Sequence, residues 1–169
     1  MKIDVPRVRA LWRDQQGSAI LECALVLPVL IALLTGVFEF SGLFYQQHLV
    51  SIGLRDALSY LANAPDTCNP NSRVWAIEQA RAKNLAVTST MAGGRSRISG
   101  WNPAMVMLQC TEVDNPVEPS GLRRYRGSSV YVVSMSTQFT YRSLGFLDLL
   151  KLQSPVISAS YSERVLGYH

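Results

Sequence analysis

An uninterrupted apolar run near the N-terminus is the strongest feature in the pattern of hydrophobic and polar positions. The stretch from Ser18 to Phe38 contains a single charged residue, Glu22, and is long enough to cross the hydrocarbon core of a bilayer as a helix. Aromatic residues, which favour a membrane–water interface, follow at Phe38, Phe40, Phe44 and Tyr45. The pattern therefore predicts one membrane-spanning helix.

The predicted helix extends beyond these aromatic residues. Its apolar positions have a spacing compatible with one buried face: Leu43, Leu49, Val50, Ile52, Leu54, Leu58 and Leu61. Turn-forming residues dominate Asn63 to Ser72, so we expect the helix to end near Ala62. Pro28 removes the hydrogen bond to the Ala24 carbonyl, which predicts a kink of the kind that membrane helices tolerate.

A second, shorter helix is predicted after the turn. Ser72 is a suitable N-cap for a helix that begins at Arg73. Its expected apolar face consists of Val74, Ile77, Ala80 and Leu85. This spacing predicts a helix that packs one side against the rest of the domain.

Alternating apolar and polar residues predict strands in the C-terminal half. Within Val130 to Tyr141 one face carries Tyr131, Val133, Met135, Phe139 and Tyr141, and the other carries Ser134, Ser136, Gln138 and Thr140. Ala104 to Val113 also has strand character, as does the stretch in which Ile157, Ala159 and Tyr161 alternate with serines. The predicted fold class is α+β: a long N-terminal transmembrane helix, a short helix and a small antiparallel sheet.

Positive charge is concentrated before the apolar run. Of the formal net charge of +4, +2 lies before Gly17, where Lys2, Arg7, Arg9 and Arg13 stand against Asp4 and Asp14. The positive-inside rule then places the N-terminus in the cytoplasm. The predicted organisation is a basic leader over residues 1–17, a transmembrane and extended helix over 18–62, and an extracytoplasmic domain over 63–169. The chain lacks a basic helix or base-stacking motif, so we expect no nucleic-acid binding.

The three cysteines carry different expectations. Cys68 and Cys110 lie in the polar remainder, where a disulfide would close a loop of about 43 residues and stabilise the fold by about 4 kcal/mol in the chain-entropy model. Two unpaired thiols are the alternative. Cys23 lies in the apolar run, where we expect a small buried packing residue rather than a redox group. No pair has CxxC spacing, so we predict no metal site.

Glu22 is the residue that ordinary membrane signals do not explain. An ionised carboxylate in a membrane helix costs about 2.5–3.5 kcal/mol near the centre on insertion scales, and less toward the end. A cleaved secretory signal needs small residues at positions −3 and −1, which the stretch from Leu33 to Gly42 does not supply. A lipoprotein signal fails because the hydrophobic run follows Cys23. An uncleaved anchor leaves Glu22 without a role.

A basic leader, a glycine, four residues, a glutamate and a long apolar helix resemble the class III signal of type IV pilins and pseudopilins. The chain further resembles TadE-like proteins, the minor pseudopilins of tight-adherence (Tad) pilus and secretion systems. The matching features are Gly17, Glu22, "ALVLP" at 24–28, "FEF" at 38–40 and "RDALSYLA" at 55–62. One departure is Cys23, where such proteins usually carry Phe or Tyr.

This resemblance implies that a membrane-embedded prepilin peptidase cuts between Gly17 and Ser18. The new ammonium of Ser18 would pair with Glu22 of a neighbouring subunit and select subunit register. The implied partners are the peptidase, other pilins or pseudopilins, the inner-membrane pilus assembly machinery and membrane lipid. The implied location is the inner membrane, single-pass, with a cytoplasmic N-terminus and a periplasmic or extracellular C-terminal domain, or the assembled pilus.

Catalysis is not expected from the remaining residues. The two histidines, His48 and His169, are far apart in the sequence, and we find no motif for a nucleophile, a cofactor or a metal. The basic cluster of Arg123, Arg124, Tyr125 and Arg126 favours a solvated loop over a contact with acidic partners or lipid headgroups. Two other functions stay open: an uncleaved single-pass protein that binds an envelope component, and a pseudopilin of a type II secretion apparatus.

Overall fold

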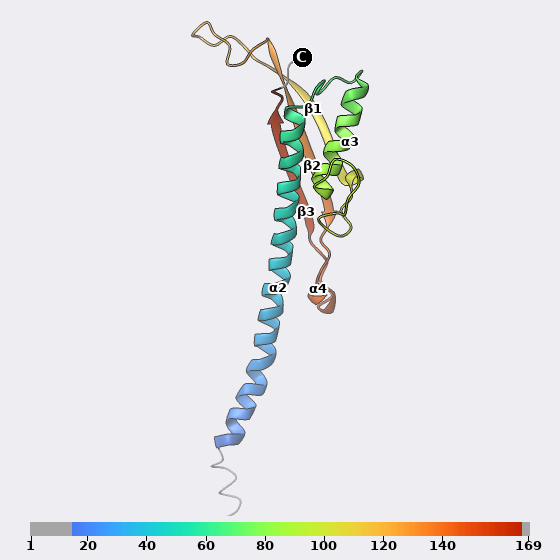
Figure 1. Ribbon diagram of the computed structural model, residues 1–169. Helices are drawn as coiled ribbons and strands as arrows, with labels where there is room; N and C mark the ends of the chain where they lie inside the picture. The colour runs from blue at the N-terminus through green and yellow to red at the C-terminus, as the bar shows by residue number, and fades with distance from the viewer. Residues whose placement is uncertain (1–14, 167–169) are drawn as a thin grey trace, which may run out of the picture. The chain divides into compact units, whose positions relative to one another are not determined.

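The computed structural model describes residues 15–166 (Figure 1). Its elements in chain order are α2 (Gln15–Ala62), α3 (Arg73–Thr88), the 3₁₀ turn η1 (Pro103–Met105), β1 (Val106–Asp114), β2 (Ser129–Thr140), α4 (Phe146–Leu149) and β3 (Val156–Arg164). The predicted α+β fold is confirmed. The charged residues expected in the leader lie at 1–14, outside the described residues. The chain divides into two compact units, Met1–Ser41 and Gly42–His169, so α2 contributes to both.

In the first unit, the described residues form the apolar part of α2. Large apolar side chains are exposed around the whole helix: Ile20, Leu21, Leu25, Val26, Leu27, Val29, Leu30, Ile31, Leu33, Leu34, Val37, Phe38 and Phe40. Thr35 and Ser41 donate their hydroxyl protons to carbonyls one turn earlier, at 2.8 Å and 2.7 Å. Such internal bonds leave these hydroxyl groups satisfied without water, as a lipid environment requires.

The second unit begins with the remainder of α2, which is buried on one face instead of exposed all round. Five side chains on one face of this part are fully buried: Val50, Leu54, Ala57, Leu58 and Leu61. Their spacing of three and four residues is that of a helix packed on a core. The predicted buried face is therefore confirmed, except that Ile52 points away from it and is exposed.

The second helix, α3, begins at Arg73 as predicted. The Ser72 hydroxyl accepts hydrogen bonds from the backbone N–H groups of Val74 and Trp75 and so caps its first turn. The predicted apolar face was wrong, because Val74 and Ile77 are exposed. The buried side chains are Trp75, Glu78, Ala82, Ala86 and Val87. Burial of the large Trp75 removes more apolar surface from water than burial of Val74.

The three strands form one antiparallel sheet in the order β1-β2-β3. Val133 pairs with Cys110 and Glu163, and Ser134 pairs with Gln109 and Ser162. The predicted alternation on β2 is confirmed. Its apolar face joins the same core as the buried faces of α2 and α3, and its other face carries serines.

One polar residue, Thr137, interrupts the apolar face of β2. Its hydroxyl accepts a hydrogen bond from the indole Nε1–H of Trp101 at 3.0 Å and donates to the Met105 carbonyl at 2.9 Å. Trp101 is buried and stacks on Phe139, with ring centroids 5.9 Å apart. Buried polar atoms of both residues are thereby paired, so this polar position is compatible with the core.

Candidate functional site

The bond predicted to be cut lies within the first turn of the long helix. The backbone of Gly17 and Ser18 is helical, since α2 begins two residues earlier at Gln15. Glu22 follows Ser18 by four residues, or about one helical turn, and the Glu22 side chain is exposed. A carboxylate is therefore presented one turn from the position at which cleavage would create an ammonium.

The part of α2 that follows this segment is exposed over residues 19–34. Cys23, expected to be buried, is a free and exposed cysteine. Pro28 lies inside α2 without ending it. Among the described residues, α2 is the single helix long and apolar enough to cross a membrane, within Ala19–Ala62. One apolar N-terminal helix of this kind fits a single-pass membrane anchor.

A polar cluster joins α2 to α3 in the second unit. Tyr60 donates a hydrogen bond to the buried carboxylate of Glu78, which also pairs with Arg81 at 2.8 Å. Hydrogen bonding with Tyr60 and, second, attraction to Glu78 raise the pKa of Arg81 above its ordinary value. The carboxylate is tolerated inside the domain because both partners contact it. The sequence offered one signal of this cluster, the three-residue spacing from Glu78 to Arg81.

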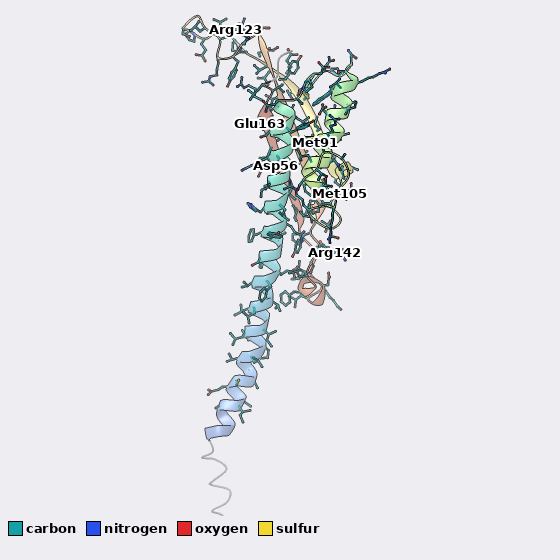
Figure 2. All side chains as sticks on the ribbon, in the orientation of Figure 1. Asp56, Met91, Met105, Arg123, Arg142 and Glu163 are labelled. Carbon is teal, nitrogen blue, oxygen red and sulfur yellow. A yellow bond between two sulfur atoms is a disulfide. The ribbon has the colours of Figure 1, made fainter. Side chains whose placement is uncertain are left out.

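Further contacts attach the end of α2 to the sheet and its loops. Asp56 pairs with Arg97 at 2.9 Å, and Ser59 donates a hydrogen bond to Glu163 at 3.2 Å (Figure 2). The backbone N–H of Leu166 donates to the Ala62 carbonyl at 2.7 Å. The C-terminal part of α2 is thus built into the domain by polar contacts as well as by its buried apolar face.

Cys68 and Cys110 form a disulfide, with their Cα atoms 5.7 Å apart. The bond joins the turn after α2 to the middle of β1. It lies just after the end of α2, and Cys68 is packed against the core. The bond thus joins two segments of the second unit that are 42 residues apart in the sequence.

The basic cluster lies in the loop of the β1–β2 hairpin. Asn115, which the sequence did not lead us to predict, holds this loop in place. Asn115 is 4% exposed, and its side-chain amide donates to the carbonyls of Tyr125 and Gly127 at 2.7 Å and 2.8 Å. Arg123 donates to the Asn115 backbone carbonyl. Arg164 of β3 lies over the Tyr125 ring, 3.9 Å from its centroid. Contacts within the domain therefore hold this arginine-rich hairpin, whose arginines remain largely exposed.

Residues 17–58 match the family model of TadE-like proteins. This segment is TadE-like. The match begins at Gly17, the residue before the predicted cut, and ends on the buried face of α2 at Leu58. The resemblance recognised in the sequence is therefore confirmed over this segment. Comparisons with curated proteins and with solved structures find no match.

The TadE-like segment contains both kinds of helix surface described above. Its first part is apolar on all sides, and its last part, from Val50 to Leu58, is packed into the domain. Among residues 15–166, no group of three or more His, Cys, Asp or Glu side chains is arranged to hold a metal ion. The arrangement is suited to anchoring a folded domain to a membrane or to a bundle of like helices.

Proposed function

We propose that the protein is a minor pseudopilin of a Tad-type pilus that acts in pilus assembly, adherence or secretion. It is inserted with its N-terminus in the cytoplasm, and a prepilin peptidase cuts it between Gly17 and Ser18. The apolar helix then holds it in the inner membrane until it joins or primes a pilus. Its role is structural, and the chemistry of processing belongs to the peptidase.

The observation that carries this proposal is the TadE-like match from Gly17, at the head of a helix with apolar side chains exposed all round. So much exposed apolar surface is unfavourable in water. It is favourable in contact with lipid or with neighbouring apolar helices. The same match favours a Tad system over the type II secretion alternative.

Gly17 suits a scissile position for two physical reasons. It lacks a side chain that would obstruct close approach to the peptidase. It also lowers helix stability by about 1 kcal/mol relative to alanine, which eases unwinding of the first turn of α2. Gly17→Ala should therefore reduce processing, and normal processing of that variant would contradict the proposed cut.

Glu22 would set the register between subunits. In an apolar helix bundle an unpaired carboxylate is costly, and an ammonium at Ser18 of the next subunit would compensate its charge. Glu22→Gln removes the charge and keeps the shape of the side chain. We expect this variant to be processed but to assemble poorly, and assembly equal to that of the native protein would refute the charge pair.

The decisive test is the N-terminal mass of the membrane-extracted protein from cells with and without the prepilin peptidase. The proposal predicts a start at Ser18 only when the peptidase is present. A start at Met1 in both samples would favour the uncleaved anchor that binds an envelope component. Gly36→Ala, in the same apolar helix, is a matched control that should leave the start at Ser18 unchanged.

A further inference from the structure

We infer that the β2–β3 connection, residues 141–155, is a second membrane contact that lies at the lipid headgroups beside the point where α2 enters the domain. The inference rests on the proposed insertion of α2 in the membrane. It adds an interfacial surface on the folded domain to the single anchoring helix.

The connection packs against Gly42, where the part of α2 that belongs to the second unit begins. A Cβ atom built on Gly42 would lie 2.8 Å from the Tyr141 hydroxyl oxygen and 3.3 Å from a methyl group of Leu144. The absence of a side chain at Gly42 thus lets the connection approach α2 closely. The connection also contains the short helix α4 (Phe146–Leu149).

The position of Gly42 along α2 gives the depth of this contact. Gly42 follows Phe38, the last residue of the predicted membrane segment, by four residues, or about 6 Å of helix. The headgroup layer on each side of a bilayer is about 5–7 Å thick. A segment that touches Gly42 therefore lies at the depth of the headgroups.

The exposed side chains near Gly42 are those that an interface favours. Leu150 and Leu152 of the connection are 50% and 54% exposed. Phe44 and Tyr45 of α2 are exposed close to the same level along the helix. Arg142 and Lys151 add two positive charges, against one negative charge at Asp148. Apolar side chains flanked by basic ones favour the surface of a bilayer with anionic lipids.

The backbone of the connection is suited to a place with little water. The N–H groups of Gly145, Leu150, Lys151 and Leu152 all donate hydrogen bonds within the connection. Internal satisfaction of backbone donors lowers the cost of approaching the hydrocarbon.

The opposite end of the sheet provides an internal comparison. β2 separates the two ends by 12 residues, or about 40 Å. The hairpin at one end contains Arg123, and the opposite end, where the connection begins, contains Arg142 (Figure 2). Leu122, in the far hairpin, is 72% exposed and serves as a matched position.

The test uses the full chain in liposomes that contain phosphatidylglycerol. Cys23→Ala leaves the introduced cysteine as the free thiol, since Cys68 and Cys110 are bonded. Single cysteines at Leu150, Leu152, Leu122 and Val29 are labelled with an environment-sensitive fluorophore. Quenching is measured separately with lipids that carry shallow nitroxide groups and with lipids that carry deep ones. We expect labels at Leu150 and Leu152 to be quenched at least about twofold more than at Leu122, since interfacial contacts reach about 5–10 Å into the bilayer.

Each other outcome overturns the inference and identifies its error. Weak quenching at Leu150 and Leu152, with Val29 deep in the bilayer, would mean that α2 is inserted and the connection stays in water. Weak quenching at Val29 by the deep nitroxide groups as well would mean that the proposed membrane insertion has failed. A blue-shifted label at Leu152 without lipid quenching would indicate contact with a second protein. Lys151→Glu should weaken the quenching at Leu152, because it replaces a charge that attracts anionic lipid with one that repels it.

Discussion

Gly53 of α2 lies directly against the backbone of Ala86 near the end of α3. A Cβ atom at Gly53 would lie 2.2 Å from the Ala86 carbonyl oxygen, a separation that real Cβ atoms do not adopt. Glycine at this position therefore sets how closely the two helices approach. The buried faces of both helices share one core, so a shift at this contact extends to the side chains packed around it.

Gly53→Ala should destabilise the domain by about 1–3 kcal/mol, because the added methyl group must displace backbone rather than a side chain. The measurement is thermal unfolding of the membrane-extracted protein, followed by near-UV circular dichroism of the buried tryptophans. Gly36→Ala in the same helix has open space around its Cβ position and should leave the domain's transition unchanged. Equal transitions for both variants would show that the contact at Ala86 is not tight.

Thr137→Val should destabilise the domain by about 1–3 kcal/mol even though the two side chains have the same shape. The substitution leaves the buried Nε1–H of Trp101 without its acceptor at 3.0 Å. Denaturant unfolding measures the loss. Thr111→Val, on the exposed part of β1, is the matched control and should change stability by less than about 0.5 kcal/mol. A stability gain at position 137 would mean that apolar contact outweighs the hydrogen bond.

Replacing both Cys68 and Cys110 by alanine should reduce the free energy of unfolding by about 2–5 kcal/mol, since the disulfide restricts the unfolded chain. Thiol titration of the unfolded, unreduced native protein checks the bond itself. It should find one reactive thiol, that of Cys23. Three reactive thiols would show that the bond is absent, and the alanine variant would then be expected to unfold like the native protein.

The sequence was most informative where structure depends on local pattern. The end of α2 at Ala62, the Ser72 cap and the alternation on β2 were predicted because propensities, caps and period-two patterns are local. The face of α3 was misread because Val74 and Ile77 have the same helical spacing as a buried face. Only the position of α2 and of the sheet decides that Trp75 and Glu78 point inward.

The same distinction applies to the candidate site. Gly17, Glu22 and the apolar run carry their signal within one continuous segment, and that segment is the one that matches the TadE-like family. Contacts between distant residues, such as Tyr60 with Glu78 or Gly42 with Leu144, leave no comparable pattern in the sequence. They depend on how the chain returns to α2 after each strand.

Asn115→Ala should loosen the β1–β2 hairpin while leaving the rest of the domain folded. The substitution removes both hydrogen bonds from the side-chain amide to the carbonyls of Tyr125 and Gly127, and the hairpin has few other buried contacts. Because the hairpin contains three arginines, limited trypsin digestion reports its opening directly. We expect cleavage after Arg123, Arg124 or Arg126 at least about tenfold faster than in the native protein, which corresponds to a loss of about 1.4 kcal/mol in the local opening equilibrium.

Asn71→Ala, which replaces an exposed asparagine in the turn before α3, is the control and should leave the cleavage rate at these arginines unchanged. Equal rates for the Asn115 variant and the native protein would show that the remaining contacts, including Arg164 on Tyr125, hold the hairpin without the amide.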